Sequence, residues 1–176
     1  MKHILVSLIT LLLVSCGFHL RGEATLAPPL HRLYLQSADP YSYLTRNLQQ
    51  YLKMSHVQLV PSPQQASTIL VLSKEHTSET LLSVSGTNQT RQYRLRMTIT
   101  FEITAANGRI LIEPQTLAEE RILTVQQSQI LGSSNEANLF YQQMRLALVN
   151  AIMNRLASNE ITQRIEYGIS SRTSPS

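Results

Sequence analysis

Residues 93–104 alternate strictly between apolar and polar side chains, and no other stretch constrains the fold as much. Successive side chains of a β-strand point to opposite faces of a sheet. The alternation therefore predicts a long strand with one face in a core and the other face polar. The polar face would carry Arg94, Arg96, Thr98, Thr100, Glu102 and Thr104.

Other extended segments flank this strand in the sequence. Asn107-Gly108 is typical of a tight hairpin turn, so residues 109–112 are expected to return antiparallel to the long strand. Residues 86–89 have turn composition and predict the tip of a second hairpin. The remaining strand candidates are residues 31–36, 57–60, 67–75, 81–85 and 117–125.

Two segments have the period of amphipathic helices. Asp39 before Pro40 predicts a helix start, with Asp39 as the N-cap, and this helix is expected to reach about Met54. Residues 133–136 read Ser-Ser-Asn-Glu, which has capping-box spacing, and an apolar stripe continues from there to Leu156. The stripe could form a groove for a cofactor or partner, or could pack the helix on the apolar face of the sheet.

This order of elements predicts an α+β fold. We expect a two-layer sandwich, with a mixed four- to five-stranded sheet and two helices packed on one face. We expect the chain to divide into a signal peptide at residues 1–15, a lipidated N-terminus and tether at 16–30, the α+β domain at 31–158, and a disordered polar tail at 159–176.

The chain begins with a basic and apolar leader that ends at a cysteine. Lys2 and His3 precede an apolar run over residues 4–14, which is too short to span a bilayer and is typical of a signal peptide. Leu13-Val14-Ser15-Cys16 matches the pattern at which bacterial lipoproteins are cleaved and acylated. Cys16 is therefore expected to become the lipid-bearing mature N-terminus.

The alternative for Cys16 is a free or buried thiol behind an ordinary secretory leader. Cys16 is the only cysteine of the 176 residues, so the exported domain has no internal disulfide. The acyl chains of a bacterial lipoprotein would hold the domain stably on a membrane. Gly17 follows the cysteine where an Asp would favour inner-membrane retention, so we expect the outer membrane, on its periplasmic side.

The composition favours binding over catalysis. The net charge of +4 is a weak signal for anionic partners, and export makes lipopolysaccharide a better candidate than nucleic acid. The chain has a single Asp and no G-x-S-x-G or H-E-x-x-H motif. We expect no catalytic residues, metal or cofactor, because the four histidines after the apolar leader do not share a metal-binding spacing: His19, His31, His56 and His76.

The chain resembles the lipopolysaccharide-assembly lipoprotein family LptE over roughly residues 13–158. The most specific match is Cys16-Gly17-Phe18-His19-Leu20-Arg21. The resemblance implies a two-helix, mixed-sheet domain that plugs the lumen of the large outer-membrane barrel LptD, and the two proteins together place lipopolysaccharide at the cell surface. Weaker matches are Ser37-Ala38-Asp39-Pro40, Gln92-Tyr93-Arg94-Leu95, Asn107-Gly108 and the final helix.

The resemblance also implies lipopolysaccharide-binding basic residues near the tip of the central hairpin and in the loop before the last helix. Here residues 83–89 and 131–135 contain none. Arg91, Arg94 and Arg96 lie just past the tip and are our candidates, since an arginine can bind a lipid phosphate through two hydrogen bonds. The alternative is that these arginines are solvated or face the barrel.

Two other functions remain open from the sequence. A lipid-binding carrier or chaperone lipoprotein without a barrel partner would need a groove between sheet and helices, whereas the apolar stripe has bulky residues such as Phe140 and Met144. An envelope hydrolase would need an unrecognised set of His and Glu residues, for which His56 and His76 are the positions to test.

Overall fold

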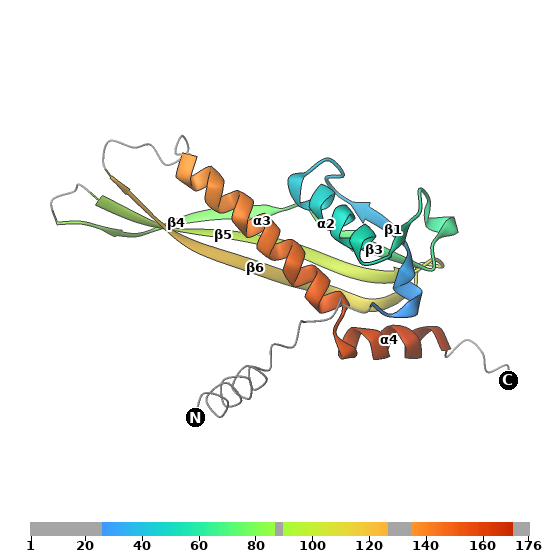
Figure 1. Cartoon of the computed structure of the whole chain (residues 1–176). Helices are drawn as coiled ribbons and strands as arrows, with labels where there is room; N and C mark the ends of the chain where they lie inside the picture. Colours follow the sequence, from blue (N-terminus) through green and yellow to red (C-terminus); the bar gives the residue numbers. More distant parts are fainter. Residues whose placement is uncertain (1–25, 87–89, 127–134, 171–176) are drawn as a thin grey trace, which may run out of the picture.

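The computed structural model describes residues 26–86, 90–126 and 135–170. One mixed sheet carries two helices, α2 and α3, on the same face (Figure 1). The elements in chain order are a 3-10 turn at Pro28–His31, β1 (Arg32–Ser37), α2 (Tyr43–Met54), β2 (Gln58–Leu59), a 3-10 turn at Pro63–Gln65, β3 (Thr68–Leu72), β4 (His76–Val84), β5 (Thr90–Ala105), β6 (Ile110–Gln126), α3 (Asn135–Leu156) and α4 (Asn159–Ser170).

Strand β5 organises the sheet. On one edge it pairs antiparallel with β3 along its C-terminal part and with β4 along its N-terminal part. On the other edge β5 pairs antiparallel with β6. Beyond β3, the sheet continues with β1 and then β2, and both of these strands pair in parallel. The predicted α+β, two-layer fold is confirmed. The sheet has six strands, and β3 and β4 lie one after the other along the same edge of β5.

The predicted alternation along the long strand is confirmed. The apolar set of β5 forms the centre of the core, while Arg94 and Arg96 remain exposed on the opposite side. Burying one face and solvating the other is the usual arrangement of an antiparallel sheet. The buried members of β5 are Leu95, Met97, Ile99, Phe101 and Ile103.

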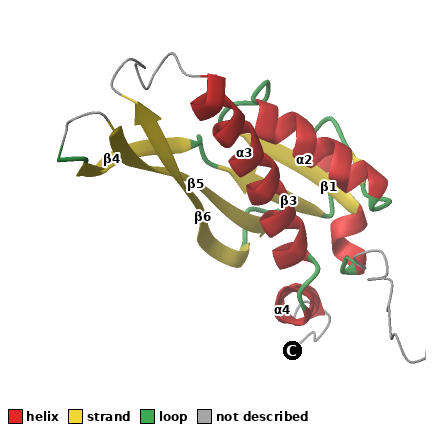
Figure 2. Cartoon of the chain, turned by 60° about the vertical axis from the view of Figure 1, so that its left-hand side comes forward, coloured by secondary structure: helices red, strands yellow, loops and turns green. Residues whose placement is uncertain are grey.

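Helices α2 and α3 lie side by side over this apolar face (Figure 2). The apolar stripe of α3 packs into the core, as predicted. Val149 and Met153 are also buried, because α3 contacts α2 as well as the sheet. Both helices contribute residues spaced four positions apart, which places their side chains on one face. These are Leu44, Leu48 and Leu52 of α2, with Met144, Leu148, Ile152 and Leu156 of α3.

The predicted start of α2 is wrong by three residues. The N-cap is Ser42, whose side chain accepts a hydrogen bond from the backbone N–H of Thr45 at 3.1 Å. Asp39 instead forms a turn, and its backbone carbonyl accepts a hydrogen bond from the Thr45 hydroxyl at 2.9 Å. Serine is as good an N-cap as aspartate, and the turn at Asp39 places Ser42 at the start of the helix.

The turn at Asn107-Gly108 is confirmed. Gly108 has a φ of 83°, which glycine adopts without the steric cost that other residues pay, and its N–H bonds the carbonyl of Ala105. The returning strand is continuous where the sequence suggested two segments. Pro114 stands in a part of β6 where the register with β5 shifts, which fits a residue that cannot donate to the ladder.

Both ends of the folded domain extend beyond the predicted limits. The tether prediction is wrong for Leu26, Ala27 and Leu30, which are buried in the core. The prediction of a disordered tail is wrong over residues 159–170, which form α4. Ile161 and Ile165 lie four positions apart and are fully buried, and the helix packs against β6. Two isoleucines in a polar segment are a weak signal until the surface that covers them is known.

Some sequence predictions lie outside the described residues. These are the signal peptide and Cys16, the hairpin tip at residues 87–89, the serines of the capping box at 133–134, and the tail at 171–176.

Candidate functional site

The candidate site lies on what we call the arm, which consists of β4, residues 90–98 of β5 and residues 118–126 of β6. The arm is the end of the sheet whose tip reaches beyond the helices, at the left of Figure 1. Its helix face is the side on which α3 lies, and its open face is the other side. The predicted lipopolysaccharide contacts Arg91, Arg94 and Arg96 all belong to the arm.

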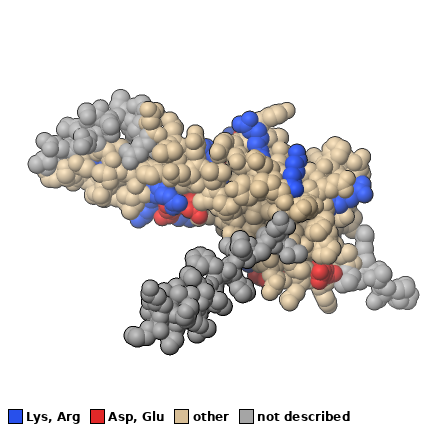
Figure 3. Space-filling model, in the orientation of Figure 1, with Lys and Arg blue, Asp and Glu red and all other residues tan. Residues whose placement is uncertain are grey.

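Arg94 and Arg96 lie together on the open face. Arg96 Nη1 is 2.7 Å from Glu120 Oε1 and Arg94 Nε is 3.6 Å from Glu120 Oε2. The three side chains are 48%, 51% and 43% exposed in the order Arg94, Arg96, Glu120. Two arginines thus share one carboxylate, so this group keeps a net positive charge. Exposed ion pairs of this kind hold their partners only weakly. Figure 3 shows a mixed basic and acidic group on the arm of a sparsely charged surface.

Arg91 is separated from the other two arginines by the pleat of the strand. It pairs with Val84 and Val125, and its odd position places it on the helix face with Tyr93 and Leu95. The side chain is half-buried, and it forms no ion pair with a carboxylate of the described residues. The structure therefore brings Arg94 and Arg96 together and places Arg91 on the other side of the sheet.

Exposed apolar side chains on the arm were missed by the sequence analysis. Ile122 is 60% exposed and lies opposite Arg94 in the register, so it neighbours the arginines on the open face. Leu81, Leu82 and Val84 of β4 are also exposed. The signal in the sequence is the broken alternation at Arg121-Ile122-Leu123, where two adjacent apolar residues must point to opposite faces. The open face therefore combines cationic and apolar groups.

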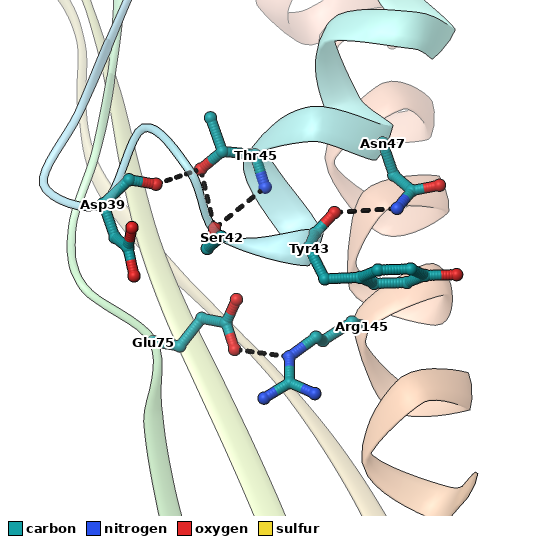
Figure 4. A network of polar contacts seen from close by, with 7 residues as sticks. All are labelled: Asp39, Ser42, Tyr43, Thr45, Asn47, Glu75 and Arg145. Carbon is teal, nitrogen blue, oxygen red and sulfur yellow. Dashed lines mark hydrogen bonds and ion pairs between the residues drawn. The ribbon is translucent and has the colours of Figure 1, made fainter.

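Two polar contacts tie the arm to α3. Arg145 Nε donates to Glu75 Oε2 at 2.7 Å, at the junction between β3 and β4 (Figure 4). One turn earlier in α3, the Tyr141 hydroxyl donates to the carboxylate of Glu79. Burial, together with this hydrogen bond, raises the pKa of Tyr141 above its ordinary value. These contacts fix α3 over β4, on the face opposite Arg94 and Arg96.

One cavity that could hold a small molecule lies away from the arm. A cavity of about 300 Å³ lies at the opposite end of the sheet, between the β5–β6 turn, Pro29 and Ile169. His56 and His76 are exposed on separate elements. Among the described residues, no three His, Cys, Asp or Glu side chains gather closely enough to hold a metal ion.

Comparison with known proteins connects this fold to a family. The model of a family described as lipopolysaccharide-assembly, LptE, matches residues 30–156, which include the whole sheet, α2 and α3. The chain belongs to the LptE family. This is a family of lipopolysaccharide-assembly lipoproteins and is not an enzyme family.

Curated relatives carry the same family name. The LPS-assembly lipoprotein LptE of Pectobacterium atrosepticum is 27% identical over 181 residues, covering 99% of this chain and 97% of that protein. The LPS-assembly lipoprotein LptE of Photorhabdus laumondii is 23% identical and covers 87% of this chain and 83% of that protein. Similarity to the first of these relatives thus extends over nearly the full length of the chain.

Solved structures share the fold. Lipoprotein B from Nitrosomonas europaea has a TM-score of 0.65 at 20% identity, covering 80% of this chain and 90% of that chain. Rare lipoprotein B from Shewanella oneidensis has a TM-score of 0.59 at 23% identity, covering 74% and 97%. In the described parts of this LptE-family chain, no helix combines the length and hydrophobicity needed to cross a membrane.

Proposed function

We propose that this chain is an outer-membrane lipoprotein, acylated at Cys16 on the periplasmic side, that plugs the LptD barrel and assists assembly of lipopolysaccharide at the cell surface. The family match over residues 30–156 carries the proposal. The LPS-assembly lipoproteins that share its length support the process, and the leader ending in Leu13-Val14-Ser15-Cys16 supports the anchor. LptD is the partner that the family resemblance implies.

The packing of the core argues against the alternative of a lipid carrier without a barrel partner. A carrier needs an open groove for acyl chains between its sheet and its helices. In this chain Phe101, Met144, Ile152 and Leu156 occupy that space and are at most 1% exposed. Interiors packed in this way leave little room for a second molecule.

The open face of the arm supports direct contact with lipopolysaccharide. Arg94 and Arg96 share a single carboxylate partner, so either guanidinium can bind a phosphate through paired hydrogen bonds. Ile122 provides apolar surface beside them. A phosphorylated glycolipid offers both kinds of group, so this face suits it better than a purely anionic ligand. Arg91 would contact lipopolysaccharide only from the helix face of the arm.

The test of the proposed function is the composition of the complex that this protein forms in its membrane. Outer membranes are extracted in mild detergent, the tagged full-length protein is captured, and its companions are identified and quantified. We expect a large β-barrel in approximately equimolar amount. Recovery of the protein alone, or with lipid and no barrel, would contradict the plug and favour the carrier.

Depletion provides a second, independent readout of the same proposal. Loss of this protein should leave the barrel misassembled and lipopolysaccharide retained in the inner compartments of the envelope. Normal surface lipopolysaccharide after depletion would rule out a role in its assembly.

A further inference from the structure

Strand β4 is the outermost strand of the arm, and its outer edge is unoccupied in the described part of the chain. It pairs only with β5, and all nine residues of His76–Val84 are exposed. Strand β6 pairs with the other edge of β5, so β4 is the outermost strand on its own side of the arm. A strand in this position presents a row of backbone N–H and C=O groups that can pair with another strand.

The opposite edge of the sheet is protected against strand pairing over part of its length, mainly at the turn end of β6. Helix α4 packs against β6, and the backbone of Gly168 lies close to Leu111. Further along, β6 contains Pro114 within a shifted register and the ion pair between Glu119 and Arg121. Covering elements, proline, irregular register and charge are the usual means of preventing edge pairing.

Strand β4 lacks most of these protections. Its sequence, His-Thr-Ser-Glu-Thr-Leu-Leu-Ser-Val, contains no proline, lysine or arginine, and its one carboxylate, Glu79, already accepts a hydrogen bond from Tyr141. Its register with β5 shifts between Leu81 and Ser83, which leaves residues 77–81 as a regular edge. Five residues of strand extend about 17 Å, enough for a short added strand.

We propose that the outer edge of β4 over residues 77–81 is a docking site for an extended segment of the LptD barrel protein, which adds to the sheet as a further strand. The inference rests on the proposed function and specifies how the partner is held. Backbone hydrogen bonds would provide the attachment, and alternate side-chain positions would provide the selectivity. The added strand would place apolar side chains beside Leu81 and small or polar ones beside Ser78 and Thr80.

A second copy of this chain fits the same edge poorly. Two copies related by a two-fold axis would pair β4 antiparallel with itself. The register that uses all of residues 77–81 is centred on Glu79, so it sets Glu79 directly opposite Glu79. Like charges directly opposite each other destabilise a strand pair. A different segment, with no acidic residue at that position, avoids this repulsion.

The test is hydrogen–deuterium exchange resolved to single amides, on the purified full-length protein alone and in its complex with the barrel. In an antiparallel pair every second residue directs its N–H to one neighbour, and in the free protein the outward amides of β4 should exchange quickly. We expect the barrel to slow exchange at alternate residues of 77–81. The matched control is the outer edge of β6 at residues 118–124, where exchange should not change in the same alternating way.

A matched pair of variants tests the same edge without the exchange measurement. Thr80→Lys places a charge on the β4 edge, where it should oppose pairing with another strand. Thr124→Lys places the same charge at an exposed position of the β6 edge. We expect Thr80→Lys to reduce the barrel recovered by capture several-fold and Thr124→Lys to leave it unchanged. Circular dichroism and urea unfolding of both variants establish that the fold is retained.

The outcomes distinguish this inference from the proposed function. A complex in which residues 77–81 exchange as in the free protein would overturn the inference and leave the barrel assignment standing. Absence of any barrel in the captured complex would overturn both. Protection of β4 in the protein alone that increases with its concentration would identify a second copy as the occupant, and would also overturn the inference.

Discussion

Arg145 of α3 and Glu75 at the β3–β4 junction form an ion pair with 2.7 Å between Nε and Oε2, and their side chains are 28% and 14% exposed. The second carboxylate oxygen of Glu75 is buried without a hydrogen-bond partner among the described residues. The pair therefore fixes α3 over the arm. Among the described residues, Arg145 is the charged group that compensates the negative charge of Glu75.

Arg145→Met should destabilise the protein by about 2 kcal/mol, because it leaves a largely buried carboxylate without its charged donor. The measurement is urea unfolding at neutral pH. The control is Arg164→Ala, which removes an exposed ion pair to Glu160 within α4 and should cost less than about 0.5 kcal/mol. Equal effects of the two variants would show that Glu75 does not depend on Arg145.

Tyr141→Phe should change how stability depends on pH. The pKa of Tyr141 is raised in the folded protein, whereas an unfolded tyrosine titrates near pH 10. Its contribution to stability is therefore complete below about pH 10 and is lost as the pH rises further, because the unfolded chain releases the phenolic proton first. Unfolding free energies between about pH 8 and 11 should decline less steeply in Tyr141→Phe than in the natural protein. Parallel curves would contradict the raised pKa.

Ile165→Ala should cost about 2–4 kcal/mol, since Ile165 is fully buried where α4 packs on the domain. Gln163→Ala, at an exposed position of the same helix, should have almost no effect. Thermal and urea unfolding of the two variants measure the difference. A tail without fixed structure would make the two substitutions equivalent.

Arg94→Ala combined with Arg96→Ala should weaken lipopolysaccharide binding, and the loss should be larger at low salt, because salt screens contacts between exposed charges and phosphate. Titration of labelled lipopolysaccharide at two ionic strengths provides the measurement. Arg46→Ala, at an exposed position of α2, is the charge-matched single control, and Arg91→Ala tests the opposite face of the arm. Unchanged affinity of the double variant at low salt would remove these residues from the site.

Cys16→Ala should abolish acylation, so that only contacts with the barrel would retain the protein in the membrane fraction. Mass spectrometry of the mature N-terminus and fractionation of the envelope measure the two effects. A lipid anchor of two or three acyl chains holds a domain far more firmly than any single chain. Membrane association that survives the substitution would show that other contacts, such as those to a barrel, retain the protein.

Several parts of the fold followed from local patterns. The alternation over residues 93–104 predicted β5 and its buried face, and Asn107-Gly108 predicted the turn that Gly108 makes with a positive φ. The apolar stripe ending at Leu156 predicted α3. Each of these signals is a periodicity or a backbone preference contained within one short stretch of chain.

Other features depended on contacts between distant residues. The sequence placed Arg91, Arg94 and Arg96 in one group, but the pleat put Arg91 on the helix face and paired the other two with Glu120 of β6. The sequence pointed to Asp39 as the N-cap of α2, whereas the Ser42 side chain caps the helix and the Asp39 carbonyl accepts a hydrogen bond from the Thr45 hydroxyl.

By itself, the sequence determined the class of fold, the main strand and helix, and the family to which the chain belongs, because periodicity and motif are properties of consecutive residues. Only the tertiary structure decided that α4 is folded and packs on part of β6, that the outer edge of β4 is uncovered in the described residues, and that Glu120 pairs with Arg94 and Arg96. Those outcomes depend on strand register and on which surfaces become buried together, and both are set by residues far apart in the chain.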